Sequence, residues 1–138
     1  MAEPTRDNLI ETMKQMDLCF MVTKDGDGLC SRPMSNNAQV DWDGDNWSFS
    51  HGDTRKVAQL EADPTVELTF NGDKDWVALR GKARLHRDDK ALFEEHWTKD
   101  LDRWFEQGVD TPGLTLIQVT ASEAELFGAS GEGVVGLG

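Results

Sequence analysis

The sequence predicts a mainly β protein, a small closed or partly closed antiparallel β-barrel with flanking helices. The first observation is that short segments rich in β-branched and aromatic residues are separated by turn-forming stretches such as KDGDG and NGDKD, which favour hairpins. The second is that three other segments have apolar residues at helical spacing. At 138 residues the chain is long enough for about one domain. We expect that domain to span residues 1–127, followed by a flexible Gly-rich tail, 128–138.

The first half of the chain begins with a predicted helix, 5–16, whose apolar residues lie about one turn apart: Leu9, Ile10, Met13 and Met16. Two hairpins are expected next, because alternating segments flank the turn sequences KDGDG and DGD. Their four strands are 18–23, 29–35, 37–42 and 46–50.

The second half continues with a predicted helix, 55–62, in which Val57 and Leu60 are one turn apart. NGDKD then joins strands 65–70 and 76–86 into a further hairpin. A third helix is expected over 88–107, with an apolar stripe that predicts core or subunit interface: Leu92, Phe93, Trp97, Leu101, Trp104 and Phe105. The last strand follows the breaker TPG and spans 114–127.

The composition narrows the class of partner. Twenty-six acidic residues against fourteen basic ones give a formal net charge of −12, which argues against nucleic acid and anionic membranes as partners. The N-terminal segment MAEPTRDNLIET lacks a basic and then apolar pattern, and no later window is a membrane-length apolar run. We therefore expect a cytoplasmic protein that binds a small molecule or another protein. Cys19 and Cys30 are expected to be reduced thiols.

Two motifs that could suggest other chemistry are weak. Residues 131–136, GEGVVG, have the spacing of a dinucleotide fingerprint, but that mechanism also needs a following helix and an acidic residue about twenty positions on, and only two residues follow the motif in this sequence. The three histidines, His51, His86 and His96, never form a metal-spaced pair, so no metal site is expected. No catalytic residue can be assigned from the sequence.

A candidate anion site lies in the segment SHGDTRKVAQL, residues 50–60. Arg55 and Lys56 fall in the first turn of the predicted helix, where the helix dipole disfavours cations. A phosphate held by these two cations and by the hydroxyls of Ser50 and Thr54 would explain their place. The alternative is that both cations point to solvent on a surface helix.

Two further segments could contribute to the same pocket. Arg32 lies on a predicted strand in which Pro33 breaks the ladder, so that Met34 and Ser35 are presented locally. In the strand 76–86, alternation puts Trp76 on the face that also carries basic residues. Taken alone, Trp76 fits a core residue at the end of a strand better than a ligand contact.

This ordered combination resembles the pyridoxamine 5′-phosphate oxidase-like flavoproteins of the FMN-binding split barrel, and among them the general stress protein group. The resemblance covers roughly residues 5–127. Phe49-Ser50 precedes Thr54-Arg55-Lys56 at the gap that separates an aromatic-Thr pair from Ser-Arg-Lys in the oxidase, where these residues hold the FMN phosphate. The segments SRPM, DWVALRGKARL and RWFEQGVDTPGLTLIQVT are similar to further segments of the group.

The resemblance implies a split β-barrel that binds FMN at the interface of a homodimer. By resemblance, the cofactor-binding residues are Arg32, Pro33, Met34, Ser35, Phe49, Ser50, Thr54, Arg55, Lys56 and Trp76. The implied function is a flavin-dependent oxidoreductase that uses NAD(P)H or another small electron donor or acceptor. Two alternatives stay open: a non-catalytic flavin-binding or flavin-buffering stress protein, and a relative that binds a deazaflavin or haem.

The chain departs from the family pattern in three places. Asn37 stands where the oxidase has a lysine five positions beyond its strand arginine. The C-terminal GASGEGVVGLG lacks the Arg and His of the oxidase's substrate-binding segment, so oxidation of pyridoxamine phosphate is not expected. Glu125, Leu126 and Phe127 replace the Glu-aromatic-Trp that often ends the last strand of the group, which implies less aromatic cover over the pocket.

Overall fold

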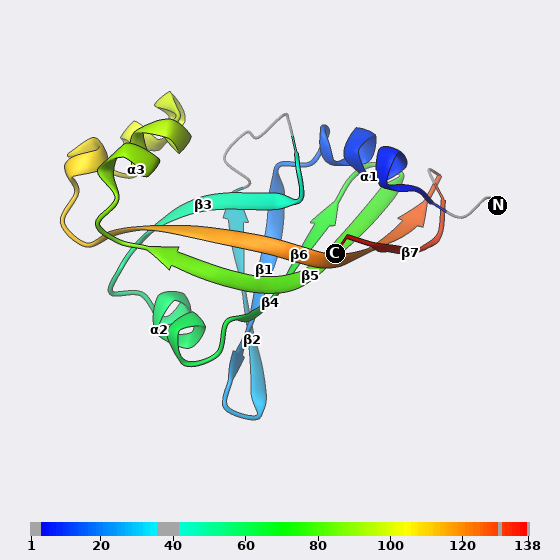
Figure 1. The fold of residues 1–138 in the computed structure, drawn as a ribbon, viewed down its shortest axis with the longest axis horizontal. Coiled ribbons are helices and arrows are strands. Elements are labelled where there is room, and N and C mark those ends of the chain that lie inside the picture. Colours follow the sequence, from blue (N-terminus) through cyan, green and yellow to red (C-terminus); the bar gives the residue numbers. More distant parts are fainter. Residues whose placement is uncertain (1–3, 36–41, 130, 138) are drawn as a thin grey trace.

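The computed structural model describes residues 4–35, 42–129 and 131–137 (Figure 1). In the described residues, one short α-helix precedes the first strand, and two α-helices and two 3₁₀ helices lie between later strands. In chain order the elements are α1 (Arg6–Met13), β1 (Leu18–Asp25), β2 (Gly28–Ser35), β3 (Asp45–His51), α2 (Arg55–Ala62), β4 (Thr65–Asn71), β5 (Asp75–His86), α3 (Lys90–His96), the 3₁₀ helices η1 (Lys99–Arg103) and η2 (Gly108–Asp110), β6 (Leu114–Gly128) and β7 (Gly133–Gly136).

The strands form one antiparallel sheet in the order β2-β1-β4-β5-β6-β3, and β7 pairs with β6. The expected mainly β fold with flanking helices is confirmed. β2 and β3 are the two ends of the main strand order, and both reach the cavity described below. The sheet is therefore curled with an opening between these two strands, as in a split barrel.

The long strands β5 and β6 connect the two ends of the molecule (Figure 1). Their register shifts between Arg80 and Gly81, where β6 has one extra residue. A side chain at Gly81 would collide with the Thr120 carbonyl oxygen, so the close approach of the two backbones requires glycine. Residues 114–120 of β6, which come before the bulge, pair with β3. Residues 123–126, which follow it, pair with β7.

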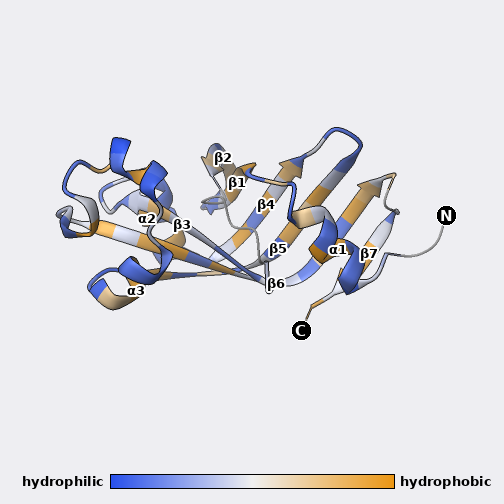
Figure 2. Ribbon diagram, turned by 90° about the horizontal axis from the view of Figure 1, so that it is seen from above, coloured by the Kyte–Doolittle hydropathy of each residue, from blue (hydrophilic) through white to orange (hydrophobic). Residues whose placement is uncertain are grey.

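The main core fills the inner face of the sheet, and Figure 2 shows apolar and polar bands alternating along the strands. Leu9 and Met13 of α1 are fully buried in this core. Thr5 and Asn8 form a capping box at the start of α1, which begins the helix at the expected place. A second, smaller cluster packs α3 and the 3₁₀ helices against β3 and β6: Phe49, Phe93, Phe105, Leu114 and Leu116.

The expectation of one helix over 88–107 is wrong. α3 ends at His96, Trp97 has an extended backbone, and η1 starts after Thr98. The Trp97 ring packs edge-on against Phe49 and Phe105, each within 6 Å between ring centres. A helical spacing of apolar residues cannot distinguish one long helix from two short ones that bury side chains in the same cluster.

Two strands differ from the expectation: the predicted strand 37–42 and the observed strand β7. The predicted strand 37–42 falls outside the described residues, except for Trp42, which is buried and donates from its indole to Asn46 Oδ1 at 2.7 Å. Strand β7 was not predicted, because it lies in the segment expected to be a tail. Its residues pair with 123–126 of β6. Among the described residues, no helix is both long and apolar enough to span a membrane.

Candidate functional site

A cavity of about 640 Å³ opens where the ends of β2 and β3 meet the start of α2 and the η1 segment. It lies at the split in the sheet, because β2 and β3 line it from opposite ends of the strand order. Seven of the ten residues that the sequence proposed for cofactor binding line this cavity: Pro33, Met34, Ser35, Phe49, Ser50, Thr54 and Lys56. The structure therefore brings together three segments that are separate in the sequence.

One end of the cavity carries hydroxyl groups. Ser50 is buried at the end of β3, and its Oγ lies 3.3 Å from Thr54 Oγ1, just before α2. Both hydroxyls donate to the His51 carbonyl oxygen, at 2.9 Å from Ser50 and 3.1 Å from Thr54. Thr54 is the N-cap residue of α2 but makes no capping hydrogen bond with its side chain. Since a hydroxyl rotates about its C–O bond, both groups can redirect their hydrogens to an acceptor in the cavity.

Lys56 brings positive charge to the same end. Its side chain is half-buried in the cavity wall, in the first turn of α2. In the part of the chain that the structure describes, the Lys56 ammonium has no ion-pair or hydrogen-bond partner. Burial and, next, the charge of Arg32 lower the pKa of Lys56 below its usual value. An unpaired, partly desolvated cation beside two hydroxyls and a helix N-terminus suits an anion such as a phosphate.

The other two cations of the predicted site do not line the cavity. Arg55 is largely exposed and lies over the β1–β2 hairpin, 3.7 Å from Asp25 Oδ2 and 3.8 Å from Cys30 Sγ. The guanidinium of Arg32 is directed into the protein, where Gln59 and Thr23 accept hydrogen bonds from it. Of three neighbouring cations, the fold therefore leaves only Lys56 facing the cavity.

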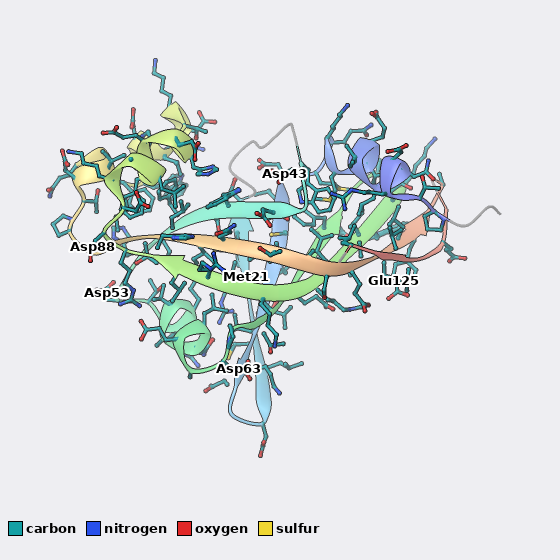
Figure 3. All side chains as sticks on the ribbon, viewed as in Figure 1. Met21, Asp43, Asp53, Asp63, Asp88 and Glu125 are labelled. Carbon is teal, nitrogen blue, oxygen red and sulfur yellow. The ribbon has the colours of Figure 1, made fainter. Side chains whose placement is uncertain are left out.

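Trp76 is also not part of this cavity. It lies near the start of β5, where it pairs with Asn71 and Phe127, and 44% of the residue is exposed. Figure 3 shows Glu125, two residues before Phe127, at the opposite end of the molecule from Asp53 of the turn before α2. Within one chain, Trp76 therefore does not line the cavity that contains Lys56.

The η1 segment forms a wall of the cavity that the sequence analysis did not identify. Its contribution includes Arg103 and Trp104, whose guanidinium and ring centre are 5.4 Å apart. Trp104 was expected in an apolar stripe of the core or of a subunit interface, and 66% of it is exposed in the single chain. The signal that could have revealed it is its position beside Phe105, which is buried, because neighbours in a tight turn point to different sides. Leu18, an exposed residue at the start of β1, also lines the cavity.

Besides its cations, the cavity wall includes three ionisable side chains, Asp17, His51 and Asp100. Cys19, in the adjacent interior of the barrel, is buried, and burial followed by the charge of Asp17 raises the pKa of its thiol to about 12. That thiol therefore stays protonated and is not a nucleophile. Within residues 4–35, 42–129 and 131–137, no group of three His, Cys, Asp or Glu side chains could hold a metal ion. The arrangement suits binding of an anionic, partly apolar ligand that supplies its own chemistry.

Comparison with protein families gives one match that spans nearly the whole chain. The family model described as pyridoxamine 5′-phosphate oxidase like matches residues 4–137. Among curated proteins, no sequence matches significantly.

Solved structures with the same fold include several bacterial proteins. The General Stress Protein 26 of Bacillus anthracis has a TM-score of 0.79 at 17% identity, covering 95% of this chain and 97% of that one. The general stress FMN/FAD binding protein of Xanthomonas citri has a TM-score of 0.74 at 25% identity, covering 89% and 87%. A FAD-binding protein of Mesorhizobium loti has a TM-score of 0.66 at 15% identity, covering 86% and 91%.

Proposed function

Because the chain belongs to the pyridoxamine 5′-phosphate oxidase-like family, we propose that it binds FMN in the cavity between β2, β3, α2 and η1. The observation that carries the proposal is the half-buried Lys56 ammonium, which has no partner among the described residues and lines the same cavity as the Ser50 and Thr54 hydroxyls. A phosphate would supply the missing negative charge. The similar protein of Xanthomonas citri, described as FMN/FAD binding, supports a flavin as the ligand.

The residues of the cavity fit the two parts of FMN. The phosphate is held by Lys56, Ser50, Thr54 and the first turn of α2, and the apolar ring system packs against Pro33, Met34 and the η1 wall. A bound flavin supplies hydride or electron transfer. The chain's own residues bind and orient the ligand and restrict the access of water. The proposed activity is therefore that of an FMN-dependent oxidoreductase with a small-molecule electron donor or acceptor.

Trp76 enters the proposal through a second subunit. In one chain it does not line the cavity, so we infer that it approaches the flavin from a partner in a homodimer. The exposed apolar residues of the outer sheet surface support such a dimer. We call this surface the outer apolar face: Leu18, Phe20, Trp76, Phe127 and Val134. Trp76 and Phe127 are cross-strand partners, and Val134 pairs with Glu125 in the adjacent row.

The experiment is to add FMN to the purified protein, remove free flavin by gel filtration and record the absorption spectrum of the protein. The proposal predicts stoichiometric bound oxidised flavin. NAD(P)H added under anaerobic conditions should then bleach the flavin, with turnover once an acceptor is supplied. Absence of bound flavin would refute the cofactor assignment. Tight FMN binding without reduction by any nicotinamide donor would show that the protein binds flavin but is not an NAD(P)H-dependent oxidoreductase.

A further inference from the structure

Arg32 uses its donors inside the protein. One guanidinium nitrogen donates to the Met21 carbonyl oxygen at 3.1 Å, to Thr23 Oγ1 at 2.8 Å and to its near neighbour, the Cys30 carbonyl oxygen, at 3.3 Å. The other donates to Gln59 Oε1 at 2.7 Å. Arg32 is not among the described residues that line the cavity. A guanidinium with these four acceptors has few donors left for a ligand.

Gln59 is the point at which this network reaches α2. Its side-chain oxygen accepts from Arg32 and, at 2.6 Å, from the hydroxyl of Thr23. Its amide nitrogen lies 3.5 Å from Cys30 Sγ. Gln59 and Thr23 are both buried, so these hydrogen bonds are shielded from water and are costly to break. The β1–β2 hairpin is thus tied to one face of α2 by a compact polar cluster.

Lys56 lies on the same face of α2, one turn before Gln59. A rotation of the helix about its axis would move both side chains together. The two apolar anchors of α2, Val57 and Leu60, resist such a rotation only by non-directional packing. The hydrogen bonds at Gln59 add the directional restraint.

We propose that Arg32 is a positioning residue, which acts through Thr23 and Gln59 to fix the rotation of α2 and so directs the Lys56 ammonium into the cavity, without contacting the phosphate itself. The inference rests on the proposed function, because it concerns the phosphate end of the FMN site. It also assigns roles to Thr23 and Gln59, which are not among the residues that the sequence predicts for the site. The repulsion between the Arg32 and Lys56 charges supports the same geometry, since it favours a Lys56 side chain that points away from Arg32.

The test measures the ratio of FMN to riboflavin affinity, which depends on the phosphate contact and not on the ring site. Gln59→Met keeps the size of the side chain but removes both acceptor and donor. We expect it to lower this ratio about two- to tenfold, the equivalent of one hydrogen bond, while riboflavin affinity stays unchanged. Thr23→Val, which removes only the hydroxyl, should lower the ratio in the same direction and provides a second route if Gln59→Met folds poorly.

Double variants decide whether the effect passes through Lys56. In a Lys56→Met background, Gln59→Met should cause no further change in the ratio. Likewise, Arg32→Met should cause little further loss once Gln59 is Met. A ratio that Gln59→Met and Thr23→Val leave unchanged, or an Arg32→Met effect that is undiminished in the Gln59→Met protein, would overturn the inference. If Lys56→Met itself left the ratio unchanged, the proposed phosphate site would fail instead.

Discussion

At the scale of single residues, the fold separates three cations that are close in the sequence or in space. Arg55 lies near Asp25 and Cys30 at the surface, Arg32 bonds to Gln59, and Lys56 faces the cavity. The sequence predicted the anion site from the presence of cations at a helix start. It could not predict which cation would face inward, because that depends on the rotation of α2 and on side-chain hydrogen bonds. Seven of the ten predicted residues line the cavity because the ends of β2 and β3 and the start of α2 meet there.

Lys56→Met should stabilise the ligand-free protein by about 0.3–1 kcal/mol, because it removes a cation from a helix N-terminus. The pKa of Lys56 is lowered in the folded protein, mainly by burial. The cost of its charge is therefore present at neutral pH and is relieved as the pH rises from this lowered pKa towards the unfolded value. Urea unfolding at neutral and alkaline pH should show the advantage of the variant shrinking with pH.

The matched control for this change is Lys74→Met, which removes the same charge from an exposed residue of the β4–β5 turn. Its effect on stability should stay within about 0.5 kcal/mol, as for most surface substitutions. Equal effects of the two substitutions would show that Lys56 carries no special charge cost.

At the scale of elements, turn chemistry and alternation were sufficient for the hairpins β1–β2 and β4–β5. They were not sufficient for the segment after β5, where burial in the second cluster decides the structure. α3 is held over β3 by a stack of rings: Trp47 lies 3.8 Å from His96 and 6.0 Å from His86, between ring centres. α3 also leads directly into η1, which forms a cavity wall.

The His96 stack predicts loss of stability in mild acid. Burial lowers the pKa of His96, the charge of His86 acts in the same direction, and the carboxylates of Glu95 and Asp43 oppose them. The unfolded chain takes up this proton near pH 6.5, whereas the folded protein takes it up only at lower pH. This contribution is complete above about pH 6.5 and is lost as the pH falls through the folded pKa.

His96→Phe tests this expectation, because the substitution keeps a ring against Trp47 and removes the titrating group. The free energy of unfolding should fall less between about pH 8 and about pH 5 in the variant than in the wild type. The same fall in both proteins would mean that other groups cause the acid sensitivity.

At the scale of the whole molecule, the fold class followed from the sequence, but the strand β7 and the position of Trp76 did not. β7 has only four residues, rich in glycine, and forms because the edge of β6 is available to it. Trp76 is in the predicted strand and on the outer face, yet its distance from the cavity could be known only from the sheet order. A second subunit that covers the outer apolar face would bury Trp76 and explain why this large apolar side chain is exposed in the single chain.

A homodimer should therefore depend on the outer apolar face. Phe20→Asp places a charge at the β1 side of that face, and sedimentation should show a shift towards monomer with a parallel loss of FMN affinity. Leu29→Asp is the control, because Leu29 is also exposed, at 72% against 54% for Phe20, but lies at the turn end of the β1–β2 hairpin, away from the residues of that face. A wild-type monomer that binds FMN with full affinity would contradict the two-subunit site.

The most direct test of the account is the increase in melting temperature that saturating FMN causes in the wild type, in Lys56→Met and in Lys74→Met. Ligand stabilisation at fixed concentration follows affinity, and one charge-assisted hydrogen bond contributes about 1.5–3 kcal/mol, roughly ten- to a hundredfold in affinity. We expect a large shift for the wild type and Lys74→Met and a clearly smaller one for Lys56→Met. An equal shift in all three proteins would contradict the claim that Lys56 holds the phosphate.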